Sequence, residues 1–139
     1  MVKLVVGAKG KGKTKYMLEN ANTEGKSSDG LVIYLDKNSE HMFQLDRCIR
    51  LINVKEYPVN SFDSLIGFLC GLVAGNSDIV SIYIDSFLIL ADIDSTAAAE
   101  AFNKMQILSD KLGVDFTISA SMDENELPDS LKENITLAL

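Results

Sequence analysis

The sequence has no long hydrophobic run. Its longest apolar candidate, residues 65–74, has about half of the roughly 20 residues that a membrane-spanning helix needs. The first residues, MVKLVVGAKGKGKT, contain too short an apolar core for a signal peptide, and their basic residues lie mostly on the wrong side of it. We therefore expect a cytoplasmic protein that has no membrane partner.

Cysteine and arginine are scarce. Cys48 and Cys70 are the two cysteines, they show no metal-ligand spacing, and both lie among apolar residues. We therefore expect buried free thiols rather than a disulfide or a zinc site. Arg47 and Arg50 are the two arginines, which argues against the arginine-rich phosphate clamp that small-molecule kinases use.

Positive charge is scarce over most of the chain and concentrated at one end. The net charge is −7, but residues 1–26 carry a balance of +4 and the remainder −11. A nucleic-acid surface usually needs a basic face over much of the domain, so nucleic acid is not an expected partner. Charge clustered around one glycine-rich loop suits a compact polyanion such as a nucleoside triphosphate.

Apolar residues are abundant, at 47% of the 139 residues, and they predict a single domain over residues 1–139 with alternating strands and helices. Short β-branched runs predict strands at 2–6, 31–35, 49–54, 79–84, 115–120 and 135–139. Helical spacing predicts helices at 14–21, 61–75, 95–113 and 130–133, the first of which ends near Gly25. This alternation predicts an α/β fold, a three-layer α/β/α sandwich around a mainly parallel sheet.

Two glycines interrupt the predicted helix 61–75. Gly67 and Gly71 lie four residues apart and therefore on one face of that helix. We expect this bare backbone to pack closely against the sheet. Ser61 is the expected N-cap of the same helix.

Residues 7–14, GAKGKGKT, match the phosphate-binding pattern G-x-x-x-x-G-K-[ST] in full. Glycines at the two ends of the pattern permit backbone angles that side chains block, so successive N–H groups can point at phosphate oxygens. The helix that follows adds its positive N-terminal end. Lys13 can reach the β- and γ-phosphates, and the Thr14 hydroxyl can bind Mg²⁺. The predicted nucleotide-binding residues of the loop are Gly7, Ala8, Lys9, Gly10, Lys11, Gly12, Lys13, Thr14 and Lys15.

Asp85 follows the apolar strand 79–84. Ligands of parallel α/β sheets bind beyond the carboxyl ends of the strands, and both Asp85 and the glycine loop lie at such ends. An aspartate in this place can hold Mg²⁺ through its water shell. We therefore predict ATP and Mg²⁺ as cofactors, with Thr14 and Asp85 as the metal-binding residues.

The glycine loop and the segment IYIDS resemble the Walker A and Walker B motifs of P-loop NTPases. The order of segments is similar to that of the RecA/KaiC-type branch, with LVIYLDKNSEH at 31–41 and IVSIYIDSFLIL at 79–90. The resemblance covers residues 1–123 and extends to small bacterial ATP-binding proteins, some of them labelled twitching-motility-like ATPases. It implies that the strand within DFTISASMD lies between the two Walker strands and carries a polar sensor, Ser119 or Ser121.

The resemblance implies a slow ATPase or an ATP-driven switch but leaves the catalytic base open. Many relatives have a glutamate directly after the Walker B aspartate, where this chain has Ser86. Glu40 is nearest to the RecA-type position past the second strand, about two residues late, and Glu56 is a weaker substitute. We take Lys13 and Glu40 as the candidate catalytic residues. An arginine finger would come from one of the two arginines or from a partner, either a second copy in a homo-oligomer or another protein.

Two other functions remain open. The first is a nucleotide-binding module that does not hydrolyse, which the missing glutamate favours. The second, less favoured, is a small nucleotide or metabolite kinase. A GTPase is disfavoured because residues 85–88, DSFL, lack the glycine of the D-x-x-G switch and no N-K-x-D signal occurs.

Overall fold

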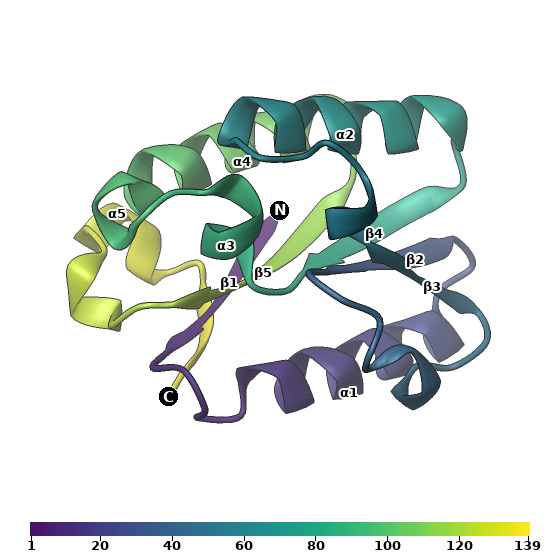
Figure 1. Cartoon of the computed structure of the whole chain (residues 1–139), viewed down its shortest axis with the longest axis horizontal. Coiled ribbons are helices and arrows are strands. Elements are labelled where there is room, and N and C mark those ends of the chain that lie inside the picture. Colours follow the sequence, from purple (N-terminus) through teal and green to yellow (C-terminus); the bar gives the residue numbers. More distant parts are fainter.

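The computed structural model describes all 139 residues and is built on one six-stranded sheet (Figure 1). Every neighbouring pair of strands is parallel, in the order β3-β2-β4-β5-β1-β6. The strand that contains Ser119, β5, therefore lies between the glycine-loop strand and the strand that precedes Asp85, as predicted. The strands are β1 (Val2–Gly7), β2 (Leu31–Asp36), β3 (Ile49–Asn53), β4 (Ile79–Ile84), β5 (Asp115–Ser121) and β6 (Ile135–Ala138).

Helices cover both faces of the sheet. Figure 1 shows α1 alone on one face and α2, α3 and α4 on the other, which confirms the α/β class and is consistent with three layers. None of the helices combines the length and the apolar character that crossing a membrane requires. The helices are α1 (Lys13–Ser27), α2 (Phe62–Gly75), α3 (Phe87–Ala91), α4 (Ala98–Leu112) and α5 (Asp129–Lys132).

The two faces of the sheet differ in chemistry. The face under α2, α3 and α4 carries the larger apolar cluster, whereas the α1 face carries a smaller one that includes two stacked tyrosines, Tyr34 and Tyr83. Polar groups lie within this smaller cluster between α1 and the sheet. Glu24 of α1 accepts hydrogen bonds from the Ser81 hydroxyl at 3.0 Å and the Tyr83 hydroxyl at 2.8 Å. The glycine loop joins the carboxyl end of β1 to this helix.

Two of the helix ends that were predicted from local sequence agree with the structure, and one does not. Ser61 caps α2 through a capping box with Ser64, and Gly113 ends α4 in the left-handed conformation. The first helix, however, runs past Gly25 to Ser27. A Cβ at Gly25 would lie 2.9 Å from Cγ1 of Ile49, so this glycine permits close packing of α1 on β3 rather than a break.

Three burial expectations are wrong. Cys48 is exposed and Cys70 is only half-buried, although both thiols are free. Gly67 and Gly71 do not pack against the sheet, because a Cβ at either position would meet no atom within 4 Å. Helical spacing placed these residues on one face correctly, but it could not tell whether that face meets the sheet.

The glycines provide a matched test of the packing. A Cβ at Gly30 would lie 2.3 Å from Cγ1 of Val80 and 2.9 Å from the Asp78 carbonyl oxygen, and backbone cannot rotate away. We expect Gly30→Ala to lower the free energy of unfolding by about 1–3 kcal/mol. Gly71→Ala is the control, and it should raise the same quantity by about 0.5–1 kcal/mol because alanine is the better helix former. Urea denaturation measures both; a destabilised Gly71→Ala would contradict the open environment.

Candidate functional site

The glycine loop connects β1 to α1 and adopts backbone angles that favour glycine. Gly10 has φ +83° and Gly12, which directly precedes α1, has φ +96°. No side chain caps the N-terminus of α1, so the backbone N–H groups of its first turn are free to meet an anion. The conformation predicted from the sequence pattern is therefore present at Gly12.

Lys13 is the first residue of α1, and its side chain folds back onto the glycine loop. Its ammonium donates hydrogen bonds to the carbonyl oxygens of Gly7 at 2.8 Å and Ala8 at 3.0 Å. Burial lowers the pKa of Lys13, the charge of Asp85 opposes that shift, and the charge of Lys37 adds to it. The ammonium is thus held by neutral carbonyls, which an anionic ligand can replace with stronger, charge-assisted partners.

Asp85 is buried and held by three donors. The Tyr34 hydroxyl donates to Oδ2 at 2.8 Å, while the Ser119 hydroxyl at 2.6 Å and the Ser86 N–H at 2.9 Å donate to Oδ1. Burial is the main cause that raises the pKa of Tyr34, and the nearby charge of Asp85 adds to it, so the tyrosine stays a donor. The carboxylate is therefore oriented before any ligand arrives, and its free lone pairs suit contact with the water shell of a cation.

A second carboxylate, that of Asp36, ends the neighbouring strand β2. It is 3% exposed, and its Oδ1 accepts a hydrogen bond from the Lys37 N–H at 2.7 Å. Burial, followed by the charge of Asp85, raises its pKa to about 6. Asp36 was not among the predicted site residues, although it follows the same pattern as Asp85, an acid at the carboxyl end of a buried strand.

These elements surround a cavity of about 230 Å³ at the carboxyl edge of the sheet. None of the ten residues that line it is hydrophobic. The glycine loop forms one wall, and the ends of β2, β4 and β5 form the other. The lining residues are Lys9, Gly10, Gly12, Lys13, Thr14, Lys37, Asp85, Ser86, Ser119 and Ser121.

Most, but not all, of the predicted site residues meet in this cavity. Seven of them line it, together with Ser121, the alternative sensor. The structure does not bring Glu40 there: its carboxylate is exposed and lies 3.3 Å from Nε2 of His41. Four predicted loop residues also lie outside the lining, namely Gly7, Ala8, Lys11 and Lys15.

The donor set at the cavity suits a magnesium ion shared with a nucleotide. The Thr14 hydroxyl and the Asp85 carboxylate are hard oxygen ligands, the type that Mg²⁺ prefers. No group of three or more histidine, cysteine or acidic side chains could hold a metal by itself. Mg²⁺ usually takes only one or two carboxylates and completes its shell with water and phosphate oxygens, so these residues fit the ion only alongside a phosphate ligand.

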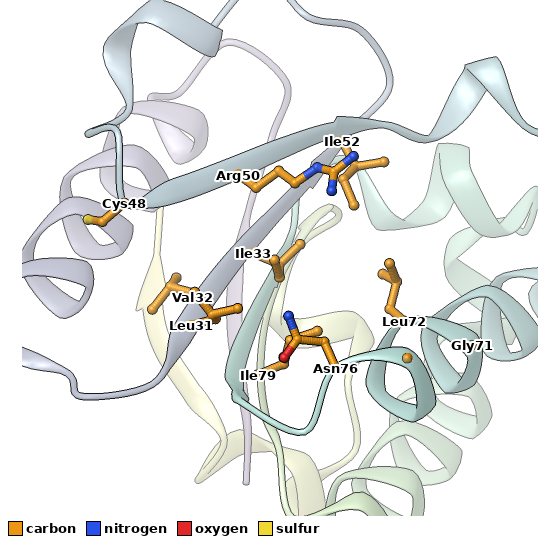
Figure 2. Close-up of a pocket in the computed structure, with 11 residues that line it drawn as sticks. Leu31, Val32, Ile33, Cys48, Arg50, Ile52, Gly71, Leu72, Asn76 and Ile79 are labelled. Carbon is orange, nitrogen blue, oxygen red and sulfur yellow. The ribbon is translucent and has the colours of Figure 1, made fainter.

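A larger, mainly apolar cavity of about 450 Å³ lies between α2 and the face of the sheet formed by β2 and β3 (Figure 2). Leu31 and Ile79 begin their strands there, and the C-terminal part of α2, from Gly71 to its C-cap Asn76, lines the other side. Seven of its eleven lining residues are hydrophobic. Since ligands of parallel sheets bind at the carboxyl ends of strands, the polar cavity is the candidate site despite its smaller volume.

No protein-family model matches the chain, and no curated protein matches it significantly. The features that bear on function are therefore the sequence motifs and the geometry of the polar cavity.

Proposed function

We propose that the protein binds Mg-ATP in the polar cavity, as a P-loop NTPase of RecA-like type that works as an ATP-driven switch with slow hydrolysis. The observation that carries the proposal is the composition of this cavity. A glycine loop with left-handed angles, a lysine at the helix start and an oriented aspartate surround a space without any hydrophobic lining. Backbone N–H groups, an ammonium and a carboxylate are the partners that a magnesium-bound triphosphate requires.

The position of β5 supports the RecA-like assignment. This strand lies between β1 and β4, which the resemblance to the RecA/KaiC-type branch implied. Its Ser119 contacts both Asp85 and the Ser86 N–H. A hydroxyl so placed is suited to a sensor that responds to the terminal phosphate.

Slow hydrolysis follows from the carboxylates of the cavity. Hydrolysis needs a group that positions the attacking water and accepts its proton. Asp85 is the one carboxylate that lines the cavity, and three donors already engage it. Because Glu40 points to solvent beside His41, a nucleotide-binding module that does not hydrolyse is the second candidate function.

Calorimetric titration with ATP, ADP and GTP, each with and without Mg²⁺, tests the proposal. We expect saturable binding of ATP that Mg²⁺ strengthens, and weaker binding of GTP. Phosphate release from the same samples should be close to the background rate, because no second carboxylate lines the cavity. Absence of binding at millimolar ATP and Mg²⁺ would refute the proposed function, whereas rapid phosphate release would refute only its slow-turnover part.

A further inference from the structure

Lys37 is a cavity residue that does not belong to the glycine loop. It directly follows Asp36 at the end of β2 and lines the polar cavity. Its ammonium lies 3.3 Å from Oγ of Ser86. Its charge also lowers the pKa of Lys13, so two ammonium groups face the same small space. Asp85 is the one carboxylate that lines this space, and it offsets only part of the repulsion between the two ammonium groups. A polyanion bound between them would offset the rest.

The two lysines come from opposite walls. Lys13 belongs to the loop wall, and Lys37 to the wall formed by the ends of β2, β4 and β5. Loop amides and the N-terminus of α1 grip the phosphates nearest to them. The phosphate that projects farthest from the loop must then meet the strand-end wall. Lys37 is the one cation on that wall.

Ser86, the contact of Lys37, has an unusual backbone. Its φ of +57° is left-handed, and only one other non-glycine residue of the chain, Asp92, has a positive φ. Its N–H donates both to Asp85 and to the Ser119 hydroxyl at 2.9 Å. Non-glycine residues in this region carry strain that the surrounding structure must sustain, and such residues concentrate at functional sites. This conformation leaves the Ser86 hydroxyl at the cavity, within reach of Lys37.

The arginines cannot take this role within the chain. Arg50 lines the apolar cavity between α2 and strands β2 and β3 (Figure 2). Arg47 is exposed, in a separate pocket together with Met42 and Phe43. Neither lines the polar cavity. Any second cation at the phosphates must come from a lysine or from another molecule.

We propose that Lys37, held by Ser86, binds the terminal phosphate of the nucleotide from the wall opposite Lys13, within the same chain. The inference rests on the proposed function. It assigns Lys37 the charge that an arginine finger provides in other NTPases, without a partner subunit. The affinity for a triphosphate therefore depends on Lys37, and the affinity for a diphosphate does not.

Lys37 also lies near the buried carboxylate of Asp36, and its charge favours the ionised form of that residue. A role limited to neutralising Asp36 would affect stability and would act on ATP and ADP binding alike. The difference between the two nucleotides separates the roles. Affinities for ATP and ADP, measured on the same preparations, are therefore the decisive readout.

The experiment compares the wild type with Lys37→Gln, Lys37→Met and Lys37→Arg by titration with ATP and ADP in the presence of Mg²⁺. Lys37→Met keeps much of the aliphatic stem and provides a second neutral variant in case Lys37→Gln folds poorly. Loss of a charge-assisted phosphate contact should weaken ATP binding by about 10- to 100-fold, and ADP binding should change by less than about threefold. Lys37→Arg should restore most of the ATP affinity. Lys111→Gln is the control, because it removes an exposed lysine of α4 outside the cavity.

Each result decides the inference. Equal losses for ATP and ADP, or unchanged affinity for ATP, in a folded neutral variant would overturn it while the wild-type data leave the proposed function standing. A wild type that binds neither nucleotide would overturn the proposed function and this inference together. Selective loss of ATP affinity in either neutral variant, with recovery in Lys37→Arg, would establish it.

Discussion

Replacing Lys13 with alanine is expected to lower the affinity for Mg-ATP by about 100-fold or more. The ammonium is buried against two carbonyl oxygens, those of Gly7 and Ala8, and its pKa is already lowered by burial. A bound triphosphate would replace these neutral partners with charged oxygens, which makes stronger hydrogen bonds. The variant loses this gain for both the β- and the γ-phosphate, so ADP binding should also fall. Calorimetric titration with both nucleotides measures the effect.

The matched control for Lys13→Ala is Lys111→Ala, which removes the same charge from the exposed end of α4. It should bind ATP like the wild type, because exposed charges farther away than a Debye length are largely screened. Thermal unfolding should show that both variants fold. ATP affinity that is unchanged in Lys13→Ala would contradict the assignment of the glycine loop as the phosphate site.

Replacing Asp36 with asparagine is expected to stabilise the protein above pH 7. Burial and the charge of Asp85 raise the pKa of Asp36 from 3.8 to about 6. The folded state therefore binds a proton at this site more tightly than the unfolded state does. The stability from this site is full in acid and is lost as the pH rises from about 4 to about 6. Above that range the wild type keeps a buried charge close to Asp85, whereas asparagine is neutral and its Oδ1 can still accept from the Lys37 N–H.

The expected gain in the free energy of unfolding for Asp36→Asn is about 2–3 kcal/mol at pH 8, falling below about 1 kcal/mol at pH 4. Urea denaturation at pH 4, 6 and 8 measures it. Asp29→Asn, which changes an exposed aspartate, should show a difference within about 0.5 kcal/mol at every pH. A gain that is equal at pH 4 and pH 8 would contradict the raised pKa of Asp36.

The buried charge of ionised Asp36 lowers the stability of the protein, and a carboxylate kept at such a cost is consistent with a cation site. Two carboxylates end adjacent strands, Asp36 on β2 and Asp85 after β4, and the charge of Asp85 disfavours the ionised form of Asp36. A buried pair of this kind destabilises the free protein. Functional sites often keep such local conflicts, which the rest of the fold offsets.

Most strands and helices could be predicted from the sequence because their signals are local, whereas the short helix α3 could not. The apolar run 79–84 and the helical stripe after Ser61 can each be recognised from a few consecutive residues. The strand 79–84 has the predicted bounds. The wrong predictions fall where a residue's environment depends on distant segments. Gly25 was expected to end its helix but packs against β3, and Gly71 was expected to pack against the sheet but has no atom close to the place of a Cβ. Cys48 lies among apolar neighbours in sequence but is exposed in the fold.

The same division holds at the candidate site. The glycine loop and Asp85 were selected from the sequence, because a contiguous motif and an acid after an apolar strand can both be recognised from neighbouring residues alone. Lys37 and Asp36 were missed, since an Asp-Lys pair after a strand is no motif by itself. Only the fold shows that Lys37 lies across the polar cavity from the glycine loop. Glu40 was chosen by its distance along the chain and instead points to solvent beside His41.

The sequence alone determined an α/β fold with a glycine-rich loop at the end of its first strand, because backbone preferences and hydrophobic periodicity act over a few residues. The tertiary structure decided which side chains share the cavity. It brought the ends of β2, β4 and β5 against the loop, placed Lys37 opposite Lys13, and left both arginines outside. Such encounters depend on the packing of segments that are far apart in the chain, which no local pattern encodes.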